Sequence, residues 1–209
     1  MKYSALNIVI PVRSLRHGKS RLAPVLSKSD RHELNRCFLI NTLNVAISVA
    51  GIKAVVVVSR CPDVSKICQS RGVKYLFEVT RGGLNPALSR ASRIIRSRGV
   101  GKILVLPSDL PMVDRSDLCL LVAKAGRAGA AIAPDRWLSG TNALCVPTQG
   151  KFRFQFGFDS YAKHSVEAAR CGIKLASLPR CSLSFDVDHP RDLLYLSTFQ
   201  PSYDVWWDR

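Results

Sequence analysis

Residues 6–13 of the chain read LNIVIPVR, and residues 14–22 continue as SLRHGKSRL. The first stretch is a short apolar run that predicts a buried parallel strand, and the second is a basic loop. Four cationic side chains follow the strand: Arg13, Arg16, Lys19 and Arg21. Open α/β sheets bind ligands at the carboxyl ends of their strands, and such cations neutralise phosphate groups. We therefore expect the loop to receive a phosphorylated small molecule, with a nucleoside triphosphate as the leading candidate.

The rest of the chain is expected to alternate between strands and helices. Short apolar runs predict buried strands, and apolar residues at helical spacing predict helices. Expected strands are 6–10, 54–58, 74–77, 102–106, 130–133, 143–146, 174–177 and 183–187, and expected helices are 30–49, 62–71, 86–98, 116–125, 160–170 and 190–196. This order predicts an α/β fold with a mostly parallel sheet and helices on both faces. No linker or repeat divides the chain, so we expect one domain, residues 1–209.

The composition predicts a soluble globular protein, since 47% of the 209 residues are apolar and 22% are charged. Apolar runs such as 103–106 are far shorter than the roughly 20 residues of a membrane helix. The first residues lack a signal-peptide pattern. We therefore expect a cytoplasmic protein without a membrane partner. Seven cysteines, an odd number without metal-ligand spacing, predict free thiols.

The formal net charge is +16, from 31 basic and 15 acidic residues. Two explanations compete: an electrostatic funnel for an anionic substrate and binding of nucleic acid. The basic residues are spread along the chain without a nucleic-acid-binding motif or an aromatic stacking platform. The funnel is therefore favoured, and part of the excess charge is explained by solvated surface.

Gly18-Lys19-Ser20 looks like the end of a phosphate-binding P-loop. The match fails because Arg13 stands where that motif needs its first glycine. A backbone cradle is therefore not expected, and side-chain charge must neutralise the phosphates instead. A solvated basic loop is the alternative.

Two more loops follow expected strands. Gly82 and Gly83 allow close approach of the backbone to a ligand, while Asn85 either binds a base or ribose or caps the next helix. In LPSDLP, Asp109 directly follows a buried strand, where a carboxylate needs water, a cation or a metal. Mg²⁺ bound to a nucleotide fits this position, and a turn or capping aspartate is the alternative.

Asp186 and Asp188 stand two residues apart at the end of the expected strand 183–187. Alternate residues of a strand point to the same side, so the two carboxylates would share one face. Together with Asp109 they would form a site for a hard cation.

Six segments, taken in order, resemble one family, 2-phospho-L-lactate guanylyltransferase, which acts in the synthesis of coenzyme F(420). The segments are IPVRSLRHGKSRLAPVLS, GGLNPAL, LVLPSDLP, APDRWLSGTNAL, FQFGFDSYAKH and FDVDHPRDL. They extend from the first expected strand to the last helix. The resemblance implies a nucleotidyltransferase fold, a Rossmann-like αβα sandwich related to A-type glycosyltransferases.

The resemblance also implies roles for matching residues. The loop that takes the triphosphate contains Pro11, and the implied catalytic residues are Arg13, Lys19, Arg21 and Asp109. Asp109 and Asp188 match the carboxylates that bind Mg²⁺, with Asp186 as a further metal candidate. Residues implied in substrate binding are Gly83 and Asn85 for the nucleoside, Thr141, Gly157 and Ser160 for the acceptor, and Asn142 and His164 in support. The chain departs from the pattern at Asp159 and Tyr161, beside Ser160.

The implied reaction transfers GMP from GTP to a phosphorylated three-carbon acid and releases pyrophosphate. The acid is 2-phospho-L-lactate, phosphoenolpyruvate or 3-phospho-D-glycerate, and the Phe-Gly segment favours the last two. Two other classes stay open: a nucleotidyltransferase of the molybdopterin or sugar-phosphate type, and a basic nucleic-acid-binding protein. The aromatic tail 202–208 would either join two copies into a homodimer or cover the domain's own surface.

Overall fold

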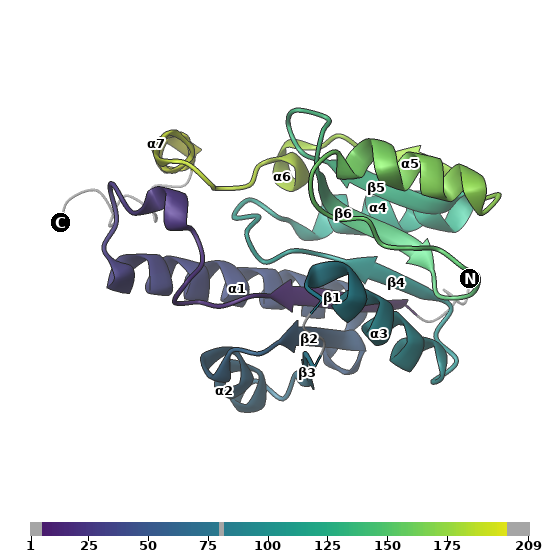
Figure 1. Ribbon diagram of the computed structural model, residues 1–209, viewed down its shortest axis with the longest axis horizontal. Helices are drawn as coiled ribbons and strands as arrows, with labels where there is room; N and C mark the ends of the chain where they lie inside the picture. The colour runs from purple at the N-terminus through teal and green to yellow at the C-terminus, as the bar shows by residue number, and fades with distance from the viewer. Residues whose placement is uncertain (1–5, 80–81, 200–209) are drawn as a thin grey trace.

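The computed structural model describes residues 6–79 and 82–199. Its strands form one seven-stranded sheet in the order β3-β2-β1-β4-β6-β5-β7 (Figure 1). The strands are β1 (Leu6–Val12), β2 (Val55–Ser59), β3 (Lys74–Phe77), β4 (Lys102–Val105), β5 (Gly129–Pro134), β6 (Thr141–Pro147) and β7 (Lys174–Ser177). Within this sheet β6 pairs antiparallel with β4 and β5, and the other pairings are parallel.

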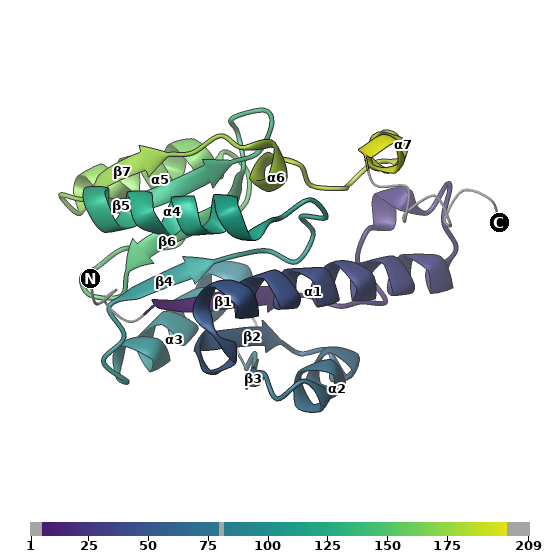
Figure 2. The same ribbon diagram turned by 180° about the vertical axis from the view of Figure 1, so that it is seen from behind.

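Helices cover both faces of the sheet. They are α1 (Lys28–Ala50), α2 (Pro62–Ser70), α3 (Leu84–Arg96), α4 (Arg115–Ala128), α5 (Ser160–Arg170), α6 (Cys181–Ser184) and α7 (Pro190–Phe199), with short 3-10 helices η1 (Ser20–Leu22) and η2 (Ile52–Ala54). α1 and α4 lie over one face and α3 and α5 over the other (Figures 1 and 2). The fold is thus the expected αβα arrangement around a mostly parallel sheet.

A third apolar cluster lies beyond the end of β1 and joins segments far apart in the sequence. It contains Leu22 and Leu26 from the basic loop, Leu34 and Phe38 from α1, Phe185 and Val187, and Leu193 and Leu196 from α7. Figure 1 shows α7 beside the loop that follows β1. Burial of these side chains stabilises the contact and brings the chain around Asp188 close to Lys19.

The expected strand 183–187 is wrong. Residues 181–184 form the short helix α6, and residues 185–189 are irregular. Leu183 is buried in the cluster between the sheet and helices α1 and α4, whereas Phe185 and Val187 are buried in the third cluster. The alternation of apolar and polar residues therefore reflects packing onto two clusters, without strand pairing.

The first helix also begins earlier than expected. Its N-cap is Ser27: the Ser27 hydroxyl accepts from the Asp30 backbone N–H, and the Asp30 carboxylate accepts from the Ser27 N–H. The two bonds form a capping box. Among the described helices, none has the length and apolar character needed to cross a membrane. The aromatic tail 202–208 lies outside the described residues.

Candidate active site

The site is built at the carboxyl edge of the sheet. Val9 pairs with Val105, and Val105 pairs with Leu144. The chain beyond β1 and the chain beyond β4 therefore leave the sheet at the same edge. Because β6 is antiparallel, its first residue, Thr141, lies at this edge too. Segments from three strands thus meet where open α/β sheets bind ligands.

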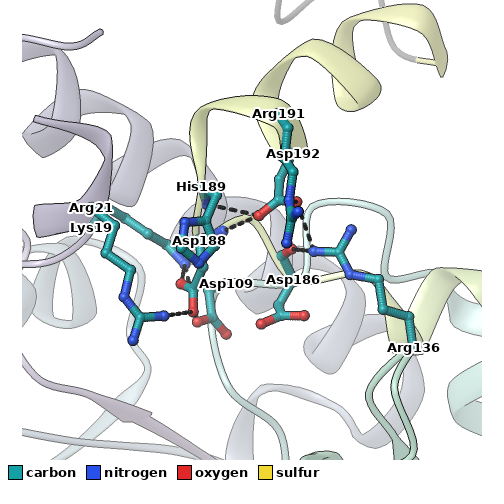
Figure 3. A network of polar contacts seen from close by, with 9 residues as sticks. All are labelled: Lys19, Arg21, Asp109, Arg136, Asp186, Asp188, His189, Arg191 and Asp192. Atoms are coloured by element: carbon teal, nitrogen blue, oxygen red, sulfur yellow. Dashed lines mark hydrogen bonds and ion pairs between the residues drawn. The ribbon is translucent and has the colours of Figure 1, made fainter. Parts of the chain in front are cut away.

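The basic loop inserts Lys19 between two carboxylates. Its ammonium Nζ lies 3.1 Å from an oxygen of Asp109 and 3.1 Å from an oxygen of Asp188 (Figure 3). Lys19 has a left-handed backbone with φ of 56°, a conformation that costs energy for a residue other than glycine and is often found at functional sites. The side-chain amide of Asn35 on α1 donates to the Leu15 carbonyl at 2.9 Å and holds the loop.

Gly18 allows the loop to pack closely against α1. A Cβ at this position would lie 2.8 Å from Nδ2 of Asn35, too close for two unbonded heavy atoms. The glycine of the Gly-Lys-Ser step therefore serves contact with α1. The failed P-loop match already pointed away from a backbone cradle for phosphate at this loop.

In these ion pairs the lysine side chain is buried, whereas the two carboxylates are partly exposed to solvent. The Lys19 side chain is 5% exposed, whereas those of Asp109 and Asp188 are 39% and 40% exposed. Burial alone would lower the pKa of Lys19, but the two carboxylates outweigh burial and raise the pKa above its usual value. Lys19 is therefore charged near neutral pH, and the open side of both carboxylates remains accessible to a ligand.

Asp186 is the third carboxylate of this region, and Figure 3 shows it beside Asp109. Burial raises the pKa of Asp186, and the negative charges of Asp109 and Asp188 raise it further. A cation brought to this region would relieve that repulsion. Asp186 is thus near enough to feel the charges of Asp109 and Asp188, although residues 185–189 are irregular and form no strand.

The donor set fits Mg²⁺ better than a softer metal. Asp109 and Asp188 already share one cationic group, and carboxylate oxygens suit hard cations. Within residues 6–79 and 82–199, no three histidine, cysteine or acidic side chains are placed to hold one ion together. The protein would therefore offer two carboxylates, the number that Mg²⁺ commonly takes when substrate phosphates complete its shell. Asp186 as a direct ligand stays a prediction.

Asp192, on the first turn of α7, fixes the backbone that carries Asp188. Its side chain is 1% exposed and accepts from the backbone N–H groups of Asp188 at 2.9 Å and His189 at 2.7 Å. Arg136 donates to the same carboxylate at 2.8 Å and to the Asp186 carbonyl at 3.2 Å (Figure 3). These bonds hold the pKa of Asp192 low despite its burial. Asp192 and Arg136 are residues whose role the sequence did not reveal.

Replacing Asp192 with asparagine is expected to weaken Mg²⁺ binding by about 10- to 100-fold, the range seen when groups that orient metal ligands are lost. The neutral amide would accept more weakly from the Asp188 N–H and would lose its charge pair with Arg136. Mg²⁺ affinity would be measured in the presence of GTP. Arg191→Gln is the matched control, because Arg191 is exposed and its ion pair with Asp192 is long, at 3.9 Å. Equal affinity in Asp192→Asn and wild type would remove Asp192 from this role.

The remaining cations of the loop, Arg13, Arg16 and Arg21, differ in their exposure and in their ion pairs. Arg21 lies 3.7 Å from Asp188 and its side chain is 65% exposed. Arg13 is exposed at the end of β1, and no ion pair joins it to a described residue. Arg16 instead pairs with Asp63 on α2 at 3.0 Å. Arg13 and Arg21 can therefore turn toward a bound triphosphate more readily than Arg16.

Thr141 and Asn142 lie at a β-bulge. Pro134 pairs with Thr141 while Ala133 pairs with Ala143, so Asn142 is an extra residue in β6. Bulges redirect side chains and are frequent next to active sites. Here Thr141 contacts His164 of α5, with 3.0 Å between Oγ1 and Nδ1. The Asn142 amide nitrogen Nδ2 is buried and has no partner among the described residues.

Asn85 holds the segment that leads to Gly157 and Ser160. Its amide nitrogen donates to the Phe156 carbonyl at 3.0 Å, and its oxygen accepts from the Phe156 N–H at 2.8 Å. Asn85 thus binds backbone instead of capping α3, and the N-cap is Gly83. Gly83 and Gly157 have φ of 85° and 124°, values that favour glycine.

Ser160 begins α5 and is buried. The N-cap, Asp159, makes no side-chain capping bond to this helix. Backbone carbonyls take its place: the Ser160 N–H donates to Gly157 and the Tyr161 N–H donates to Ser139. The expected acceptor residues Thr141 and Ser160 are therefore joined through α5, because His164 lies one turn after Ser160 and contacts Thr141.

The structure groups the expected residues into two sets. Lys19 contacts Asp109 and Asp188, Arg21 contacts Asp188, and Asp186 lies alongside. Thr141 and His164 contact one another, and Asn85 reaches the chain next to Gly157 through Phe156. Asp192 was not predicted, although the sequence contains a signal for it. It is an acidic residue three positions after His189, at a helix that begins with proline, and this spacing is half of a capping box. Asn35, which holds the basic loop, carries no such signal.

Comparisons with known proteins agree on one family. The family model described as "Guanylyl transferase CofC like" matches residues 6–199. A phosphoenolpyruvate guanylyltransferase of Rubrobacter xylanophilus is 36% identical over 90% of this chain and 91% of its own length. A 2-phospho-L-lactate guanylyltransferase of Methanothermobacter thermautotrophicus is 32% identical over 88% of this chain and 81% of its own. A solved nucleotidyl transferase from Methanothermobacter has a TM-score of 0.63 at 15% identity, over 93% of this chain and 97% of that one, a likeness of fold alone.

Proposed function

Because this chain belongs to the CofC-like guanylyl transferase family, we propose that it transfers GMP from GTP to a small phosphorylated carboxylic acid. Pyrophosphate is released, and the product serves coenzyme F(420) synthesis. Phosphoenolpyruvate is the first acceptor to test, because it names the relative from Rubrobacter xylanophilus. The other acids are 3-phospho-D-glycerate and 2-phospho-L-lactate, the second of which names the relative from Methanothermobacter thermautotrophicus.

The observation that carries this proposal is the position of Lys19 between Asp109 and Asp188. Two partly exposed carboxylates with one cation between them are suited to a metal-bound polyphosphate. When GTP binds, its phosphate oxygens offer Lys19 a new partner, and the carboxylates become free to hold Mg²⁺. Asp109 and Asp188 are the residues that would hold the ion, which would supply charge neutralisation to the triphosphate.

The chemical step needs no protein nucleophile. An oxygen of the acceptor's phosphate attacks the α-phosphorus of GTP, forming a new P–O–P bond. The bond between the α-phosphorus and its bridging oxygen breaks, and its electron pair leaves with pyrophosphate. A phosphate monoester is already ionised near neutral pH, so no general base is required. The contribution of Lys19, Arg13 and Arg21 is to orient the triphosphate and neutralise its growing charge.

The second set of residues suits the acceptor. Thr141 and the Asn142 amide offer hydrogen-bond donors, as a phosphate or carboxylate requires. The net charge of +16 favours the approach of both anionic substrates. In this proposal Lys19, Asp109 and Asp188 face the nucleotide, and Thr141 and Asn142 face the acceptor.

The direct experiment incubates the protein with GTP, Mg²⁺ and each acid in turn, and measures pyrophosphate together with the mass of the guanylylated product. Pyrophosphate and product are expected with at least one acid and not without Mg²⁺. CTP and ATP in place of GTP test the nucleotide, and another nucleotide working better would move the protein to a different transferase class. Absence of product with all three acids would refute the proposal.

A further inference from the structure

His164 cannot reach a ligand directly. It is 0% exposed and lies between Phe152 and Phe156, with ring centroids 6.1 Å and 4.8 Å away. Both ring nitrogens already have partners: Nε2 lies 3.0 Å from the backbone nitrogen of Gln155, and Nδ1 lies 3.0 Å from Oγ1 of Thr141. Any role of His164 in the reaction must therefore pass through one of these partners.

These two partners determine where the imidazole carries its proton. A backbone N–H can only donate, so Nε2 must accept from Gln155 and be unprotonated. Burial lowers the pKa of His164 to about 4, so the ring is neutral near pH 7. A neutral imidazole has one N–H, which is then on Nδ1 and donates to the Thr141 hydroxyl.

The direction of this bond constrains Thr141. Its oxygen accepts from His164, so its own hydrogen must donate to another group. No other hydrogen bond from this hydroxyl exists among the described residues. Next to it, the buried Nδ2 of Asn142 also has hydrogens without an acceptor. Two consecutive residues of the bulge thus have donor hydrogens without a described acceptor, and an anion supplies such acceptors.

We propose that His164 is a positioning residue, whose Nδ1–H tautomer makes the Thr141 hydroxyl a donor to a phosphate or carboxylate oxygen of the acceptor acid. The inference rests on the proposed function for the identity of that acid. Without His164, the hydroxyl is free to rotate between donating and accepting. Hydrogen bonds to charged groups change affinity by roughly 10- to 100-fold, and the effect falls on the acceptor and not on GTP.

The test is a double-mutant cycle with His164→Leu and Thr141→Val, read as the affinity for phosphoenolpyruvate by calorimetry and as KM for each substrate. Each single variant is expected to weaken acceptor binding about 10-fold or more, with KM for GTP unchanged. The double variant is expected to be no weaker than Thr141→Val alone, because His164 acts through that hydroxyl. Additive losses would show a general structural role for His164 and overturn the inference.

Two further variants and one measurement on the wild type distinguish the proposed role of His164 from a loss caused by misfolding. In His164→Asn, the amide NH₂ takes the place of Nδ1–H and is expected to restore most of the acceptor affinity. Ser165→Ala, at the next position of α5 and exposed, is the control and should match wild type. Nitrogen chemical shifts of His164 in the wild-type protein give the tautomer directly, and a proton on Nε2 would overturn the inference.

The readouts also separate this inference from the proposed function. Binding by calorimetry needs no turnover, so the cycle can be completed even in an inactive protein. Phosphoenolpyruvate bound by the wild type without any pyrophosphate formed from GTP would refute the transferase proposal. The cycle would still decide whether His164 orients Thr141.

Discussion

Replacing Asp109 with asparagine is expected to lower kcat by a factor on the order of 10² to 10³, the loss typical when one group that stabilises charge in the transition state is removed. The amide keeps the shape of the side chain but loses the negative charge needed by Mg²⁺. The fold should persist, because the side chain is 39% exposed and its described partner, Lys19, keeps Asp188.

Steady-state kinetics with GTP and the best acceptor would measure this loss, with circular dichroism to verify folding. Glu33→Gln is a charge-matched control, since Glu33 pairs with Arg36 on the same helix. Asp109→Glu retains the charge in a longer side chain and should keep more activity than Asp109→Asn. Wild-type kcat in Asp109→Asn would remove this carboxylate from the catalytic site.

Replacing Lys19 with methionine is expected to reduce both activity and stability. Loss of the ammonium leaves Asp109, Asp186 and Asp188 close together, with the exposed Arg21 still paired to Asp188 at 3.7 Å. Removing one partner of a buried ion pair is strongly destabilising, but exposure of the carboxylates screens the repulsion. We expect the free energy of unfolding to fall by about 1–3 kcal/mol without metal, and kcat to fall by about 10²-fold or more.

The informative measurement is urea unfolding in a chelator and again with Mg²⁺. Added Mg²⁺ should stabilise Lys19→Met more than wild type, because the ion replaces the missing charge between the carboxylates. Arg21→Gln provides the comparison for stability, since Arg21 is 65% exposed and 3.7 Å from Asp188, and it should change the unfolding free energy by less than about 1 kcal/mol. Equal stability of Lys19→Met and wild type in chelator would show that the carboxylates do not depend on Lys19.

The sequence predicts the sheet and the loops that face its edge, because buried strands have a clear apolar signature. Prediction from the sequence fails where the backbone is held by side-chain packing and side-chain hydrogen bonds instead of by strand pairing. Leu183, Phe185 and Val187 alternate as in a strand, yet they pack onto two separate clusters. Asp186 and Asp188 therefore come near Asp109 for a reason that alternation does not supply, namely the third apolar cluster and the bonds of Asp192.

The site residues divide in the same way into those placed by the order of strands and helices and those placed by side-chain contacts. Thr141 begins β6, and Lys19 and Asp109 lie in the loops that follow β1 and β4, so their place follows from the order of elements. The roles of Asn85 and His164 depend on contacts with residues 71 and 23 positions away. Nothing in the local sequence states that Asn85 binds the Phe156 backbone or that Gln155 determines the tautomer of His164.

The reversed direction of β6 has a consequence for how the site can diversify. Its first residue, Thr141, lies at the ligand edge, and the turn before it has Trp137 and Leu138 exposed. We expect insertions or substitutions in residues 137–140 to alter the surroundings of Thr141, whereas Arg136 must be kept because it holds Asp192. Under the proposed function, the antiparallel strand would let acceptor specificity change at this turn while Lys19, Asp109 and Asp188 are kept.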